Sequence, residues 1–210
     1  MSESESPRPR ALRMADIERL SAQASGGEPL ARLELAHATA AALVEAGRGS
    51  DAVRAGQLVA LADTVGLDTL AELWQDAEED TLPGVLWVLY LMRSWCHVQG
   101  EAVSRFYRAG RALAPVDEVV AGMGEEADPQ EVHRFADTVL EGAYRRDFAV
   151  ALERAAAFFR IVAIGRRESD TGCGTGASSG QPADEMAERN ERCAEALARA
   201  ARSWRAGRLR

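Results

Sequence analysis

Apolar residues recur at the three- and four-residue spacing of amphipathic helices along most of the chain. Alanine, leucine, glutamate and arginine dominate nearly every segment, and clusters of β-branched residues are short, so local propensity favours helix almost throughout. We therefore expect an all-α protein: an irregular multi-helix bundle of about seven or eight helices, followed by a flexible Gly/Ser linker and a C-terminal amphipathic helix. A weak similarity at an offset of 32 residues leaves stacked helical hairpins as a less favoured alternative.

Clusters of glycine, proline and serine divide the chain into four parts. The composition of residues 1–12 predicts a disordered arm, and the helical periodicity of residues 13–168 predicts a helical bundle domain. Residues 169–182 have the composition of a flexible linker. Residues 183–210 then form an amphipathic, arginine-rich helix.

Helix caps and helix breakers mark the expected helices within the bundle. Proline fits the first turn of a helix, whereas serine, threonine and aspartate cap its start. The expected caps are Ser50 or Asp51, Asp68, Thr81 and Asp147, and the residues from Pro115 to Asp128 predict a loop. The expected helices cover residues 14–24, 29–46, 51–66, 68–77, 83–98 and 101–112, and two more follow Pro129 and Asp147.

The most hydrophobic segment runs from Val85 to Met92 and is apolar on every side, so we expect other helices to surround it. This run ends at Arg93, far short of the roughly twenty apolar residues that a membrane span needs. We predict no transmembrane helix.

Charge is unevenly distributed along the chain. The net charge is −8, and all 25 basic residues are arginine. This balance argues against a surface that follows nucleic acid or anionic lipid. Residues 28–112 hold twelve acids and seven arginines, and residues 113–169 hold eleven and seven, whereas residues 170–210 hold six and seven. We therefore expect attraction between the acidic body and the basic C-terminal helix.

The chemistry-bearing side chains do not assemble into a recognisable catalytic or metal site. Cys96, Cys173 and Cys193 have neither disulfide-framework nor metal-knuckle spacing, and the amino terminus does not resemble a signal peptide, so we expect a cytoplasmic protein. Cys96 and His97 are adjacent and point in different directions on a helix, and His133 looks isolated. We expect no catalytic residues, metal or cofactor, which favours a non-enzymatic role.

Aromatic and arginine residues gather between residues 87 and 111. Arg105, Arg108 and Arg111 follow one another at three-residue intervals on one helix face, beside Tyr107. Such a stripe suits an acidic partner segment or an anionic ligand. The favoured alternative is that these arginines pair with neighbouring acids on a solvated face.

The C-terminal helix carries an apolar stripe that includes Leu197 and Trp204, and its last twelve residues hold five arginines, Arg199 and Arg202 among them, and no acid. Docking on the body of the same chain or on a sister subunit is the commonest fate of such a helix. Binding to a separate partner comes second, and binding to an anionic surface, either nucleic acid or lipid, comes third.

These patterns predict a non-enzymatic helical protein that acts through protein–protein contacts, as a regulator or adaptor, with the helix at residues 183–206 as its mobile contact element. The partner is another protein or a second copy of the chain. One alternative is a pocket between the helices around 85–111 and 132–162, in which Arg105, Arg108 or Tyr107 holds an anionic small molecule. Nucleic-acid binding by the C-terminal arginines is a further, disfavoured alternative.

Overall fold

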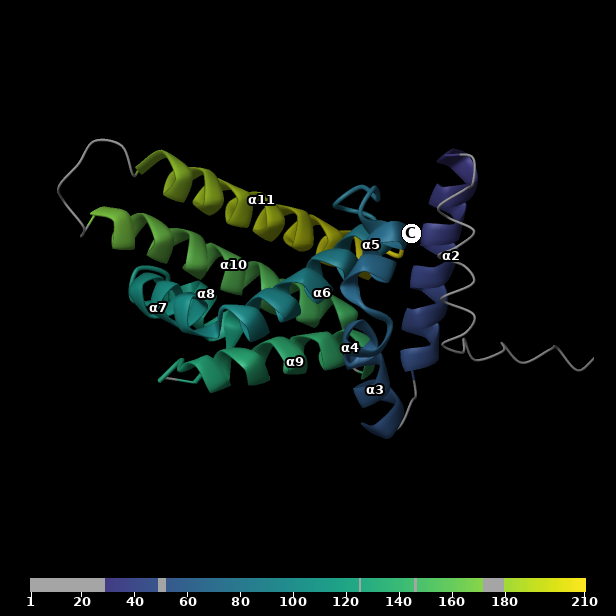
Figure 1. The fold of residues 1–210 in the computed structure, drawn as a ribbon, viewed down its shortest axis with the longest axis horizontal. Helices are drawn as coiled ribbons and strands as arrows, with labels where there is room; N and C mark the ends of the chain where they lie inside the picture. Colours follow the sequence, from purple (N-terminus) through teal and green to yellow (C-terminus); the bar gives the residue numbers. More distant parts are fainter. Residues whose placement is uncertain (1–28, 49–51, 125, 146, 172–179) are drawn as a thin grey trace, which may run out of the picture.

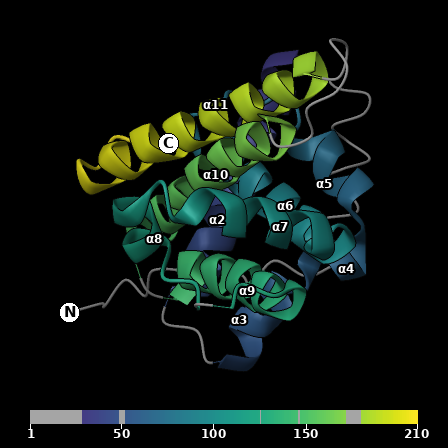
Figure 2. The same ribbon diagram turned by 90° about the vertical axis from the view of Figure 1, so that its left-hand side faces the viewer.

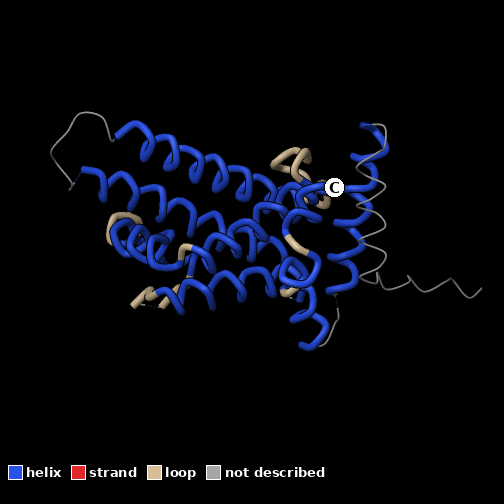
Figure 3. Tube along the Cα trace, in the orientation of Figure 1, coloured by secondary structure: helices blue, strands red, loops and turns tan. Residues whose placement is uncertain are grey.

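The computed structural model describes residues 29–48, 52–124, 126–145, 147–171 and 180–210. Every regular element in these ranges is a helix, so the expected all-α class is confirmed (Figure 3). In chain order the described helices are α2 (Pro29–Gly47), α3 (Ala52–Val59), α4 (Leu61–Val65), α5 (Leu67–Trp74), α6 (Leu82–Val98), α7 (Gly100–Arg111), α8 (Pro115–Ala121), α9 (Pro129–Arg145), α10 (Phe148–Thr171) and α11 (Gly180–Arg205).

Nine described helices precede α11, whereas the sequence predicted a bundle of seven or eight, and α8 is the most informative difference. The segment after Pro115 was expected to be a loop. Pro115 instead occupies the first turn of a new helix, where its missing N–H costs nothing, and Asp117 and Glu118 favour the same end electrostatically. Gly122, at a φ of 65°, ends the helix in the left-handed conformation. The expected helix at 51–66 is also divided, into α3 and α4.

Two of the expected caps are confirmed. The Thr81 side chain accepts a hydrogen bond from the Gly84 N–H at the start of α6, and Asp147 Oδ1 accepts one from the Ala149 N–H at 2.9 Å. The expectation for Asp68 is wrong, because Gly66 is the N-cap of α5 and Asp68 lies in its first turn.

Some expected segments fall outside the described residues. They are the arm at 1–12, the helix at 14–24, the caps at Ser50 and Asp51, and most of the linker. The expected linker bounds of 169–182 are too wide, because α10 continues to Thr171 and α11 begins at Gly180.

Helix α6 runs through the interior and is packed by helices on several sides (Figure 1). Most of its residues are buried, although Leu91 is 41% exposed. Tyr90 belongs to α6, and its buried hydroxyl donates to the Leu58 carbonyl at 2.6 Å and lies 2.9 Å from the Tyr144 hydroxyl. These bonds connect α3, α6 and α9 and satisfy polar atoms that burial would otherwise leave unpaired.

Helices α7 and α10 approach each other at a pair of glycines. A Cβ atom added to Gly165 would stand 1.7 Å from the Phe106 carbonyl oxygen, and one added to Gly110 would stand 2.0 Å from the Ile161 carbonyl oxygen. Both obstacles are backbone atoms, so they cannot move aside by a change of rotamer. Only glycine permits this backbone contact.

Helix α11 packs along α10 for most of its length (Figures 1 and 2). Ion pairs reinforce the contact: both Arg205 Nη atoms donate to Glu153, and Arg167 Nη2 donates to Glu191 Oε2 at 2.9 Å. The apolar stripe of α11 is therefore occupied by the body of the same chain. Its buried members are Ala187, Ala194, Ala196, Leu197, Ala200 and Ala201.

Further contacts hold the C-terminal end of α11. Trp204 packs on Phe148, with ring centroids 4.6 Å apart, and the Arg48 guanidinium lies 5.0 Å from the Trp204 ring centroid. The Arg210 carbonyl accepts a hydrogen bond from the Leu82 N–H at 2.8 Å. No described helix is both long enough and apolar enough to cross a membrane, as the sequence predicts.

We predict that Gly165→Ala lowers the free energy of unfolding by about 1–3 kcal/mol, because the added methyl group forces two backbones apart. The matched control is Gly56→Ala in α3, where an added Cβ meets nothing within 4 Å. That substitution should raise the free energy of unfolding by about 0.5–1 kcal/mol. Urea denaturation of both variants measures the difference, and equal effects of the two substitutions would refute the close contact.

We also predict that acid weakens the docking of α11. The Arg205 hydrogen bonds lower the pKa of Glu153, and the Arg167 hydrogen bonds lower the pKa of Glu191. A carboxyl whose pKa is lowered by folding stabilises the folded state fully above its ordinary pKa of 4.5. That stabilisation is lost as the pH falls from there through the lowered values.

The double variant Glu153→Gln/Glu191→Gln should therefore show a shallower fall in the urea midpoint below this pH than the wild type. Glu185→Gln/Glu188→Gln is the control, since these residues pair with arginines of α11 itself. Identical pH profiles for the first double variant and the wild type would contradict the prediction.

Candidate functional site

Helix α8 presents valines to solvent. Val116 is 75% exposed, Val119 81% and Val120 43%, and these three make up much of a seven-residue helix. The preceding Leu113 is 59% exposed. Contiguous exposed apolar side chains on a folded protein mark an interaction surface more often than scattered ones do.

The polar residues of α8 explain why its valines face outward. Asp117 faces α10, where its Oδ1 lies 3.4 Å from Arg160 Nε, and Glu118 faces α7, where its Oε1 lies 3.2 Å from Arg111 Nε. Ala121 is fully buried. With these positions directed inward, helical periodicity leaves the valines outside, and Val120 lies beside Asp117 on the side of Arg160.

A hollow of about 300 Å³ opens on the same side of the molecule, between α10 and α11. Helices α8 and α11 flank α10 there (Figure 2). Three arginines converge on the hollow, one from α10 and two from α11. The lining residues are Arg160, Ala194, Glu195, Ala198, Arg199 and Arg202.

The positive charge around this hollow is only partly compensated. Arg160 Nη1 is buried and has no hydrogen-bond partner among the described residues. Arg199 Nη1 stays 3.9 Å from Glu195 Oε2, beyond hydrogen-bonding distance, and Arg202 is exposed. Unsatisfied guanidinium N–H groups are suited to bind carboxylates, often with two parallel hydrogen bonds.

We call the combined region the valine–arginine surface. It joins an apolar strip on α8 to a basic rim on α11, with a partly unsatisfied arginine between them. Its members are Val116, Val119, Val120, Arg160, Arg199 and Arg202.

The structure places the C-terminal candidate residues in different environments. Arg199 and Arg202 belong to the valine–arginine surface. Leu197 is fully buried and Trp204 packs on Phe148, so neither presents its apolar face to an outside partner while α11 is docked.

The α7 candidates do not converge on one site. Arg105 and Arg108 are exposed, and Arg111 pairs with Glu118 of α8. Tyr107 is fully buried, and its ring stacks on Phe158 at 5.9 Å. The Tyr107 hydroxyl has no hydrogen-bond partner among the described residues, and burial raises its pKa to about 12.

The sequence does not predict a histidine cluster, because His97 and His133 are far apart along the chain and His133 looks isolated. Their rings stack at 4.6 Å, and His97 Nε2 lies 3.0 Å from Asp137 Oδ1. Arg93 Nε donates to the same carboxylate at 2.7 Å, while its Nη1 and Nη2 each donate to Asp63 at 2.9 Å. No local pattern could reveal this cluster, because Asp63, Arg93 and Asp137 are far apart in sequence.

This cluster is an ion-pair network that links α4, α6 and α9. Each guanidinium nitrogen of Arg93 already donates to a carboxylate, so its hydrogen-bonding capacity is directed to the fold. Those hydrogen bonds hold the pKa of Asp63 below its usual value. An adjoining hollow of about 300 Å³ is lined in part by Tyr90, Ser94 and His97.

The cysteines and potential metal ligands add no catalytic arrangement in the described part of the chain. Cys96 is buried, and burial raises its thiol pKa, which suppresses the reactive thiolate. No group of three or more histidine, cysteine, aspartate or glutamate side chains in the described ranges is placed to hold a metal ion.

Known proteins do not add to this description. Comparison of the chain with protein-family models, with curated proteins and with solved structures gave no match in any of the three searches.

Proposed function

We propose that the protein acts through protein–protein contacts, as a regulator or adaptor, and that the valine–arginine surface binds an acidic amphipathic helix of a separate protein. The observation that carries this proposal is the exposed valine face of α8 beside the three arginines around the hollow on α10 and α11.

Burial of the valines supplies the driving force. Complete burial of a valine side chain is worth about 1.5 kcal/mol or more, and Val116 and Val119 are largely exposed. The arginines add orientation and partner selectivity rather than most of the affinity, since rim charges chiefly affect association rate and specificity. An amphipathic helix offers both contacts, with apolar residues on one face and acids beside them.

The charge pattern favours an acidic protein segment over nucleic acid. Asp117 lies beside Arg160, Glu195 lines the same hollow, and Glu153 accepts from Arg205. These interspersed carboxylates weaken the continuous positive potential that a phosphate backbone requires. A protein segment can place a few acids opposite the three arginines and carry no charge opposite the carboxylates, which a continuous phosphate backbone cannot do.

A second copy of the chain is the competing partner. Glu78, Glu79 and Asp80 are exposed between α5 and α6, and they present acids that the arginines of another copy could contact. Such a contact would be head-to-tail, because the two surfaces differ. Crosslinking from the valine–arginine surface distinguishes this arrangement from a separate partner.

We predict that a photo-crosslinking amino acid at position 119 captures a specific partner in cells that produce the protein naturally. The matched control carries the same amino acid in place of Val98, which is 78% exposed at the end of α6, outside the valine–arginine surface. Mass spectrometry of the adducts should place the position-119 crosslink in an acidic amphipathic segment of another protein. Arg199→Glu/Arg202→Glu should lower its yield by about fivefold or more, by reversing the charge of the rim.

Two results would overturn the proposal. Equal crosslinking patterns at positions 98 and 119, or a yield unaffected by the charge reversal, would remove the valine–arginine surface as the contact site. A crosslink to a second copy of the chain would show that the partner is the protein itself. Sedimentation of the purified protein should then show an association state that depends on concentration.

A further inference from the structure

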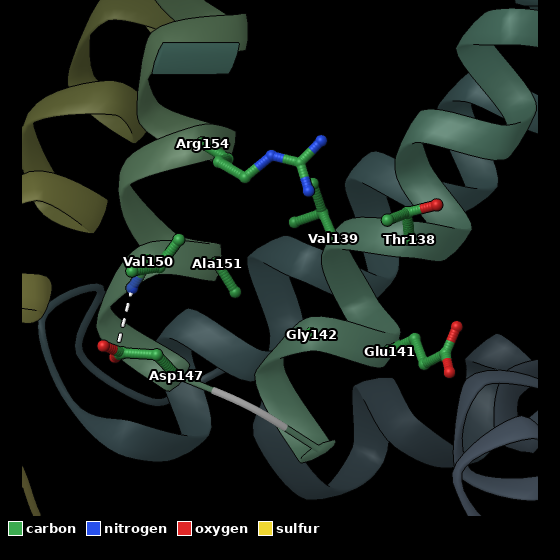
Figure 4. Close-up of a pocket in the computed structure, with 8 residues that line it drawn as sticks. All are labelled: Thr138, Val139, Glu141, Gly142, Asp147, Val150, Ala151 and Arg154. Atoms are coloured by element: carbon green, nitrogen blue, oxygen red, sulfur yellow. Dashed lines mark hydrogen bonds between the residues drawn. The ribbon is translucent and has the colours of Figure 1, made fainter. Parts of the chain in front are cut away.

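A second hollow, separate from the valine–arginine surface, lies between the C-terminal half of α9 and the first turns of α10 (Figure 4). Its volume is about 290 Å³, near the lower end of the range for small-molecule sites. The residues that line it are Thr138, Val139, Glu141, Gly142, Asp147, Val150, Ala151 and Arg154.

Among the described residues that line this hollow, Arg154 is the one cationic side chain. Its Nε donates to the Ala121 carbonyl at 2.9 Å, and its guanidinium lies 5.3 Å from the Phe135 ring centroid. These contacts hold the side chain across one end of the hollow (Figure 4). No described carboxylate forms an ion pair with it, and desolvation lowers its pKa, although an arginine remains charged at neutral pH.

The walls beside Arg154 are apolar. Val139 comes from α9, and Val150 and Ala151 come from α10, with Val150 43% exposed at the edge. Gly142 leaves the space open, because a Cβ added there would meet only the Ala151 Cβ, at 3.9 Å. The hollow therefore has a cationic end and an aliphatic body.

The two acids of the hollow narrow the choice of anion. Asp147 is engaged at the start of α10, where its Oδ1 accepts from the Ala149 and Val150 N–H groups. Glu141 points away from Arg154 (Figure 4). Neither acid is directed at Arg154, whose single positive charge compensates a monoanion but not a dianion such as a phosphate monoester.

We propose that this hollow binds a small aliphatic monocarboxylate, whose carboxylate accepts hydrogen bonds from Arg154 Nη atoms and whose alkyl group packs on Val139, Val150 and Ala151. A free short-chain acid and an aliphatic amino acid share this chemistry. This hollow is not the pocket expected between the helices around 85–111 and 132–162, because no residue of 85–111 lines it, and its cation is Arg154 rather than Arg105 or Arg108. It does not depend on the proposed protein-binding role.

The test is an NMR titration of the full chain with ¹³C-labelled valine methyl groups. Isovalerate should shift the Val139 and Val150 methyl signals and saturate with a Kd of about 1 mM, as expected for so small a ligand. Its neutral analogue isovaleramide should bind at least about tenfold more weakly, because it lacks the charge that pairs with Arg154. A titration with free valine distinguishes the two kinds of ligand. Binding as tight as that of isovalerate would assign the site to aliphatic amino acids, and weaker binding would assign it to acids without an ammonium group.

Two variants separate the site from general effects on folding. Arg154→Gln should weaken isovalerate binding by about tenfold or more, whereas Arg108→Gln, at an exposed position of α7, should leave it unchanged. Gly142→Leu should abolish binding by filling the hollow, and urea denaturation should show that the variant is at least as stable as the wild type. Absence of shifts at about 50 mM isovalerate, equal binding of the amide, or full binding by Gly142→Leu would overturn the proposal.

Discussion

The contact between Gly110 and Gly165 is the constraint on which the rest of the arrangement depends. At this point the backbones of α7 and α10 meet with no room for a side chain between them. Helix α8 follows α7 after a short connection, so the position of α7 determines where α8 reaches α10. Asp117 then meets Arg160 and Glu118 meets Arg111, and these pairs turn the valines of α8 toward solvent.

The contact between α10 and α11, on the other flank of α10, also depends on small residues. Alanines of α11 lie buried along α10, which lets the two helices approach closely while arginines and acids pair at the edges. The uneven charge of the chain thus has a structural counterpart, because Arg205 in the basic C-terminal part pairs with Glu153 in the acidic body. The close approach of α11 also brings Arg199 and Arg202 to the hollow beside Arg160.

Sequence alone predicts the parts of this fold that depend on local periodicity. The helical class, the buried character of α6 and the caps at Thr81 and Asp147 follow from residue spacing and side-chain chemistry. Helix α8 was missed because Pro115 is a strong signal for the end of one helix and an equally good signal for the start of the next.

The candidate sites were harder to predict, because each combines residues that are distant in sequence. Arg199 and Arg202 were recognisable from their own helix, but Arg160 and the valines join them only through the packing of α8, α10 and α11. The same holds for Arg154 and Val139, which line one hollow from different helices. Tyr107 differs from the exposed Arg105 and Arg108 beside it in the sequence, because the close α7–α10 contact buries it.

The valine–arginine surface exists only while α11 is docked on α10, because Arg199 and Arg202 belong to α11. Native-state hydrogen exchange of the α11 amides between Ala187 and Ala201 tests this docking most directly. We expect opening free energies within about 1–2 kcal/mol of global unfolding for these amides. Exchange slowed by less than about tenfold, as in an isolated helix, while the α6 amides stay protected, would contradict it.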